Sequence, residues 1–169
     1  MMRQKFWSER RAAIAQRWRE LVLETYPPDA SRFFQGEPDP FANPVGAAIS
    51  RALAGLYDEL RLGAPAERLS PLLDDIIRIR AVQDFSPSQA VGFVFLLKAA
   101  LREQLAGEKQ DQPMLLQELA EFDSRIDALA LLAFDIYQQC REQIFDIRVR
   151  EAKSRSESAR RARERGKVR

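Results

Sequence analysis

The stretch IIRIRAVQDFSPSQAVGFVFLLKAALREQL, residues 76–105, decides the fold of this 169-residue chain. Its second half is apolar almost all the way round, which is typical of a helix that neighbouring elements bury on every side. Ser86, Pro87 and Gln89 have the spacing of a capping box, in which the serine oxygen accepts from an early backbone N–H and proline needs no such partner. The stretch therefore predicts a helix end, a turn and a central helix over residues 87–106.

Four polar residues at the turn before the central helix are candidates for a functional site: Arg78, Arg80, Gln83 and Asp84. Arg80 and Asp84 are four residues apart, near enough for an ion pair that would simply stabilise the turn. The alternative is a small-anion or partner site, where guanidinium groups meet the free N–H groups of the central helix. Gly92 is a further candidate, because a glycine inside a helix costs about 1 kcal/mol relative to alanine. It predicts either a close helix crossing or space for an apolar ligand.

Other segments also have helical patterns. Asn43-Pro44 and Ser70-Pro71 place a capping side chain directly before a proline, as the start of the central helix does. Together with apolar positions at helical spacing, these signals predict helices over residues 3–25, 44–62 and 71 to 82 or 83. No stretch alternates as a β-strand would, so we predict an all-α fold, a compact bundle of about five helices.

Residues 26–46, YPPDASRFFQGEPDPFANPVG, contain five prolines and two glycines and predict a long loop. Phe33, Phe34 and Phe41 are too apolar for a free linker, so we expect them to pin this loop to the core. A ligand clamp is the alternative, although the Asn-Pro pair near the end of the loop is already explained as a helix cap.

The last predicted helix begins near residue 112 or 113 and is the longest. Its apolar positions recur at alternating steps of four and three, the pattern of a heptad seam: Leu115, Leu119, Phe122, Ile126, Leu129, Ala133, Ile136 and Cys140. A helix with so much apolar surface packs on more than one neighbour, and it is our preferred element for a homodimer. We expect one domain over residues 1–147 and a basic tail over 148–169 that either extends the helix or is disordered.

Positive charge is concentrated in that tail. Residues 148–169 hold ten Lys or Arg and three Asp or Glu, a net charge of 10 − 3 = +7, so residues 1–147 carry 2 − 7 = −5. A basic cluster in the tail consists of Arg160, Arg161, Arg163, Arg165 and Lys167. Three interpretations remain open: a solvated end, a contact for an acidic protein, or a contact for nucleic acid or an anionic surface. The tail has no aromatic side chain for base stacking, which argues against nucleic acid.

The chain contains no histidine and one cysteine, which excludes several kinds of site. Histidine-ligated haem, histidine-containing zinc sites and Ser-His-Asp triads require residues that are missing, and Cys140 has no partner for an internal disulfide. No glycine-rich phosphate loop occurs either. We therefore predict a protein that is not an enzyme and has no cofactor and no metal.

The location of the protein can also be predicted. The N-terminal sequence lacks the apolar centre of a signal peptide, and no window reaches the roughly 18 apolar residues that a membrane span needs. With no possible internal disulfide, a cytoplasmic protein is the simplest expectation.

Two motifs together resemble a known family. DPFANPVG, residues 39–46, followed by LDDIIRIRAVQDFSPSQAVGFVFLLKAALRE, residues 73–103, is similar to the N-terminal sensor domain of RsbRD-type co-antagonists, the stressosome relatives of RsbR. The resemblance covers about residues 7–147, and residues 79–97 are its most specific part. It implies a dimeric helical domain, related to non-haem globins, that senses an input and passes it to an attached signalling domain. It implies no established ligand residue.

The chain departs from that family in one respect. Typical members continue into a STAS domain, whereas only about 20 residues follow Ile147, and a further domain needs about 100. We therefore expect a stand-alone sensor or adaptor module that acts through protein contacts, as a homodimer. The alternative is an accessory or structural subunit of a larger cytoplasmic complex, docked through its basic tail on an acidic partner.

Overall fold

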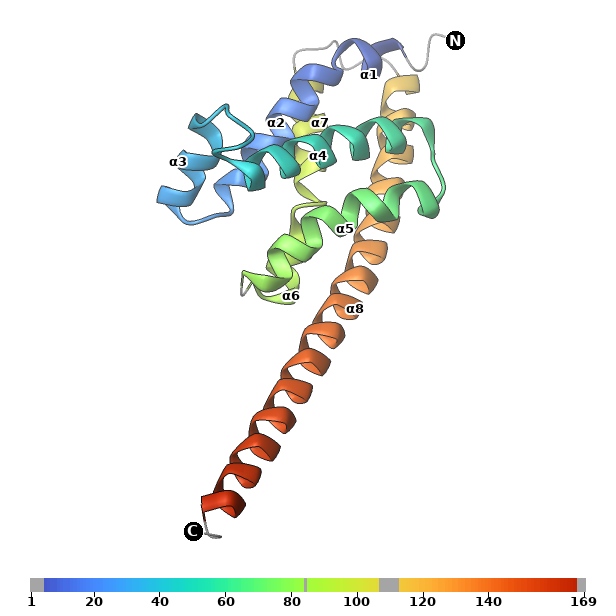
Figure 1. Ribbon diagram of the computed structural model, residues 1–169. Helices are drawn as coiled ribbons and strands as arrows, with labels where there is room; N and C mark the ends of the chain where they lie inside the picture. Colours follow the sequence, from blue (N-terminus) through green and yellow to red (C-terminus); the bar gives the residue numbers. More distant parts are fainter. Residues whose placement is uncertain (1–4, 84, 107–112, 167–169) are drawn as a thin grey trace. The chain divides into compact units, whose positions relative to one another are not determined.

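The computed structural model of the chain describes residues 5–83, 85–106 and 113–166 (Figure 1). These ranges contain helices and no β-strand, which confirms the all-α prediction. The helices are α1 (Lys5–Glu9), α2 (Arg11–Glu24), α3 (Pro28–Gly36), α4 (Pro44–Leu62), α5 (Ala66–Val82), α6 (Pro87–Gly92), α7 (Leu96–Leu105) and α8 (Pro113–Gly166). The chain divides into two compact units, Met1–Tyr137 and Gln138–Arg169, and each is described by itself.

Two of the predicted helix starts are confirmed by side-chain hydrogen bonds. Asn43 Oδ1 accepts from the N–H of Gly46 at 2.8 Å at the start of α4. At the start of α6, Ser86 Oγ accepts from the N–H of Gln89 at 3.3 Å, and Gln89 Oε1 accepts from the N–H of Ser86 at 3.0 Å. Both starts therefore satisfy backbone donors that would otherwise lack partners.

The third predicted start is wrong. α5 begins at Ala66, after Pro65, so that Pro71 lies inside the helix rather than at its first position. Ser70 does not cap α5, because its hydroxyl donates to the carbonyl of Ala66 one turn earlier, at 2.8 Å. Gly63 ends α4 with φ at 68°, and the short connection to Pro65 leaves α5 free to begin before the second proline.

The predicted loop before α4 is also partly wrong, because it contains α3. Pro28 occupies an early position of that helix, where a missing N–H is tolerated. Phe34 packs edge-on against Tyr26 with ring centroids 5.2 Å apart, so it does pin the segment. Phe33 is half exposed and Phe41 is 94% exposed, so neither is the anchor that its hydrophobicity predicted.

The predicted central helix divides into α6 and α7. Between them, each backbone N–H from Val94 to Lys98 donates to the carbonyl three residues earlier, as in a 3₁₀-helix. The first of these hydrogen bonds joins Val94 to Val91, and the last joins Lys98 to Phe95. One carbonyl of this segment, that of Phe93, accepts a hydrogen bond from the indole Nε1 of Trp18 in α2 at 2.8 Å. The buried indole therefore obtains its acceptor from backbone that has left the α-helical pattern. The predicted first helix likewise divides, into α1 and α2.

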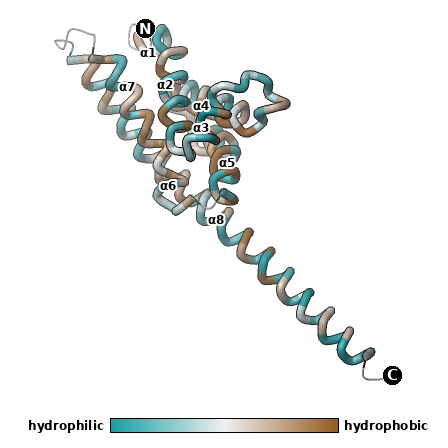
Figure 2. Tube along the Cα trace, turned by 90° about the vertical axis from the view of Figure 1, so that its left-hand side faces the viewer, coloured by the Kyte–Doolittle hydropathy of each residue, from teal (hydrophilic) through white to brown (hydrophobic). Residues whose placement is uncertain are grey.

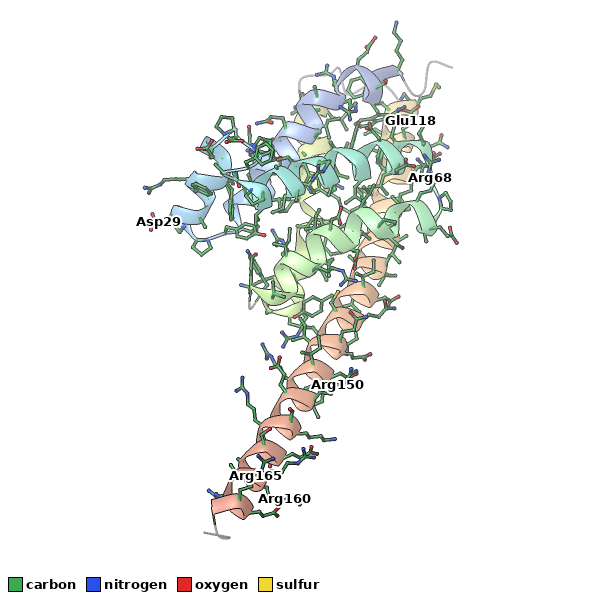
Figure 3. The ribbon with its side chains drawn as sticks, viewed as in Figure 1. Asp29, Arg68, Glu118, Arg150, Arg160 and Arg165 are labelled. Atoms are coloured by element: carbon green, nitrogen blue, oxygen red, sulfur yellow. The ribbon has the colours of Figure 1, made fainter. Side chains whose placement is uncertain are left out.

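The core of the first unit lies where α2 packs on α4 and α7, and where α4 packs on α5 (Figure 1). Its fully buried side chains include Ile14, Trp18, Val22, Leu53, Leu56, Leu73, Ile76, Ile77, Leu97 and Leu101. The first part of α8 completes this core, because Phe122 stacks on Tyr57 at 6.1 Å and meets Trp7 at 5.3 Å between ring centroids. Trp7 Nε1 also donates to Glu118, labelled in Figure 3, at 2.9 Å.

The middle of the heptad seam predicted in the last helix serves this core, whereas Leu115 and Leu119 at its start are only half-buried. Phe122, Ile126, Leu129, Ala133 and Ile136 are all buried within the first unit. Those side chains are therefore used inside one chain and are unavailable to a second copy.

The second unit is the remaining part of α8, described as far as Gly166. The predicted helical extension of the tail is thus present over the described residues. Apolar side chains thin out towards Gly166, and the helix becomes mainly hydrophilic there (Figure 2). Among the described helices, none combines the length and the hydrophobicity required to span a membrane.

Candidate functional site

Arg80 is the most unusual of the predicted site residues, because its side chain is 0% exposed. It projects from the last turn of α5. Nη1 donates to the carbonyl of Gln89 in α6 at 3.0 Å. Nη2 donates to Thr25 Oγ1 at 2.8 Å and more weakly to the carbonyl of Val22 at 3.4 Å, both at the end of α2. One guanidinium group thus connects three helices.

Three aromatic rings surround the same guanidinium. Its Cζ lies 5.0 Å from the ring centroid of Tyr26, 4.8 Å from that of Phe85 and 5.3 Å from that of Phe93. Cation–π attraction becomes stronger when the cation is removed from water. Burial lowers the pKa of Arg80 from its ordinary value, yet an arginine starts so high that it stays charged at neutral pH.

No carboxylate forms an ion pair with Arg80 in the part of the chain that the structure describes. The rings and the carbonyl end of α2, where the helix dipole is negative, provide the compensation instead. Arg80 Nε and Tyr26 Oη are both buried, and neither forms a hydrogen bond of good geometry with another described residue. The pKa of Tyr26 is raised above its ordinary value, mainly because its hydroxyl is buried. The predicted partner Asp84 lies outside the described residues.

Of the predicted residues that the structure describes, Arg78, Gln83 and Gly92 form no side-chain hydrogen bond with the Arg80 guanidinium. Arg78 is exposed and pairs with Asp74 one turn earlier on α5. Gln83 is exposed and follows the last residue of α5. A Cβ added to Gly92 would have nothing within 4 Å, so the prediction of a close helix crossing there is wrong. Among the described members of the polar cluster, Arg80 is thus the one with a buried side chain.

A groove that the sequence did not indicate lies in the first unit, where the end of α4, the start of α5 and α8 meet. Its volume is about 340 Å³, and it is lined by Leu60, Gly63, Ala64, Ala66, Leu69, Arg125, Ala128, Leu129 and Leu132. Arg125 is the one charged residue in this lining. Arg125 and Gly63 are 62 positions apart, and no local pattern links them.

Basic side chains project from the second unit, as the labelled Arg150, Arg160 and Arg165 show (Figure 3). Arg160, Arg161, Arg163 and Arg165 are all exposed. Arg160 forms a long ion pair with Glu164, 3.7 Å between nitrogen and oxygen. Lys167, the last member of the predicted basic cluster, lies outside the described residues. Over residues 5–83, 85–106 and 113–166, no group of three or more His, Cys, Asp or Glu could hold a metal ion.

Comparison with known proteins gives a clear family match. The sequence model of the RsbT co-antagonist protein rsbRD N-terminal domain matches residues 12–152. A protein of Archaeoglobus fulgidus, described only as an uncharacterized protein, is 29% identical over 84 residues. That alignment covers 49% of this chain and 51% of the relative, so the chain spans about half the length of that protein. No solved structure matches significantly.

Proposed function

Since the chain belongs to the RsbT co-antagonist RsbRD N-terminal domain family, we propose that it is a non-catalytic regulatory module that acts through contacts with other proteins. The family supports a regulatory, sensor-type role in general terms. Two surfaces support the more specific claim of protein contacts. One is an apolar stripe on the second unit, and the other is the basic cluster that follows it. The proposal places the module in the cytoplasm.

The apolar stripe is the observation that carries the proposal. It consists of apolar and small side chains that recur at steps of four, three, four and three: Phe145, Val149, Ala152, Ser156 and Ala159. Phe145 is 66% exposed, and the second unit is a single helix, so nothing in its described part covers the stripe. A helix without tertiary packing is only marginally stable in water.

A second copy of this chain is the partner that the stripe fits best. Heptad spacing is the pattern by which two helices bury one seam against each other, and small residues such as Ala152 and Ala159 permit close approach of the backbones. The predicted homodimer would therefore form through α8, but through this stripe rather than through the seam, whose middle the first unit has buried.

Sedimentation velocity of the purified chain at tens of micromolar tests the dimer. We expect a dimer for the wild type and a monomer for Phe145→Glu, because two buried carboxylates would face each other across the seam. Gln139→Glu adds the same charge to an exposed position off the stripe and should leave the dimer intact. A monomeric wild type, or a Phe145→Glu variant that dimerises as well as Gln139→Glu, would contradict the homodimer.

The basic cluster gives a separate prediction. Changing the described arginines Arg160, Arg161, Arg163 and Arg165 to glutamine should weaken capture of acidic proteins from native lysate, while the melting temperature stays unchanged. Quantitative mass spectrometry of the captured proteins provides the measurement. A matched variant with four lysines keeps the charge and should keep the capture. Equal capture by the glutamine variant would mean that the cluster is only a solvated helix end. It would also remove the support for an accessory subunit docked through its tail.

A further inference from the structure

The groove between α4, α5 and α8 has the size and the lining of a small-molecule site. Its volume of about 340 Å³ falls within the range of about 300–1,000 Å³ that is usual for such sites. Leu60, Leu69 and Leu129 are buried and form an apolar floor, beside the half-buried Leu132. The remaining neutral lining residues are alanine or glycine, so small side chains leave the space open.

Arg125 is held in place at this groove by the end of α4. Its Nη1 donates to the carbonyls of Leu60 and Arg61 at 2.9 and 3.2 Å, where the helix dipole favours a cation. The guanidinium lies against Gly63, since a Cβ there would be 3.5 Å from the Arg125 Cζ. Gly63 also has φ at 68°, a conformation that side chains disfavour. The positive φ therefore favours glycine at this position, and the arginine packs directly against it.

The positive charge of Arg125 has no acidic partner within the ranges that the structure describes, and its Nε and Nη2 donate none of the hydrogen bonds found there. No carboxylate lines the groove either. The groove thus combines an apolar floor with one fixed cation that has two unused donor nitrogens. Its complement is an apolar molecule with a single negative group.

We propose that this groove binds a medium-chain monocarboxylate, with the carboxylate on Arg125 and the alkyl chain along the leucine floor. The planar guanidinium matches a carboxylate through paired N–H donors. Each methylene that enters the groove should tighten binding about fourfold until the apolar floor is covered. The site belongs to the first unit alone and does not depend on the proposed dimer.

Isothermal titration of the full chain with hexanoate and octanoate tests the site. We expect saturable one-to-one binding with a Kd of about 1 mM or tighter for octanoate. Hexanoate should bind about tenfold or more weakly than octanoate, and octylammonium should not bind, because its charge would face the Arg125 guanidinium.

Two variants and a control locate the ligand. Arg125→Gln should weaken octanoate at least about tenfold, because the charge is lost. Ala128→Phe fills the groove without changing Arg125 and should abolish binding, so the test stands even if the first variant folds poorly. Ala120→Phe makes the same change at an exposed position of α8 outside the groove and should bind like the wild type. Absence of saturable binding, equal binding of octylammonium, or undiminished binding by Ala128→Phe would overturn the proposal.

Discussion

Replacing Arg80 with alanine is expected to lower the free energy of unfolding by about 3–5 kcal/mol. The change removes a fully buried side chain and leaves a cavity between the rings of Tyr26, Phe85 and Phe93. It also deprives Gln89 and Thr25 of a charged donor. Urea unfolding followed by circular dichroism at 25 °C measures the loss.

Two further variants separate the causes. Arg80→Lys keeps the charge but loses the planar donor fork, so we expect an intermediate loss of about 1–3 kcal/mol. Arg78→Ala removes an exposed arginine two positions away and should change stability by no more than about 0.5 kcal/mol. An Arg80→Ala variant as stable as the wild type would mean that Arg80 does not hold the helices together. If that variant also lost a ligand or partner, Arg80 would belong to a binding site.

The helix caps were predictable because capping is local. Asn43 and Ser86 each bond to an N–H three residues later, so a short stretch of sequence contains the whole interaction. Ser70 before Pro71 has the same appearance but does not cap, since α5 had already begun at Ala66. A dipeptide indicates that a start is allowed, and the surrounding packing decides which allowed start is used.

The contacts of Arg80 show what local patterns miss. Spacing along one helix suggested Asp84 as its partner, whereas the described hydrogen bonds of its side chain go to Val22, Thr25 and Gln89. Two of those residues lie 58 and 55 positions away in sequence. The groove around Arg125 was missed for the same reason. In contrast, the resemblance to the RsbRD family extends over about residues 7–147, and the family match over residues 12–152 confirms it.

Replacing Asn43 with alanine is the second change from which we expect a large effect, a loss of about 2–4 kcal/mol in the free energy of unfolding. Asn43 is only 3% exposed. Its Oδ1 accepts from the N–H of Gly46, and its Nδ2 donates to the carbonyls of Phe34 and Glu37 at 3.0 and 3.1 Å. One amide thus caps α4 and ties the end of α3 to it, so alanine leaves three backbone groups without this partner. Thermal and urea unfolding provide the measurement.

Variants at the same corner divide that loss into its parts. Asn43→Asp keeps the acceptor that caps α4 but has no amide donors, so a loss of about 1–2 kcal/mol is expected. Gly46→Ala should be as damaging as Asn43→Ala, because its Cβ would lie 2.4 Å from Asn43 Nδ2 and 2.6 Å from Oδ1. Gly36→Ala is the matched control, since a Cβ there meets nothing within 4 Å and should change stability little. If Asn43→Asp were as stable as the wild type, the cap alone would matter. The bonds to Phe34 and Glu37 would then contribute nothing to holding α3 against α4.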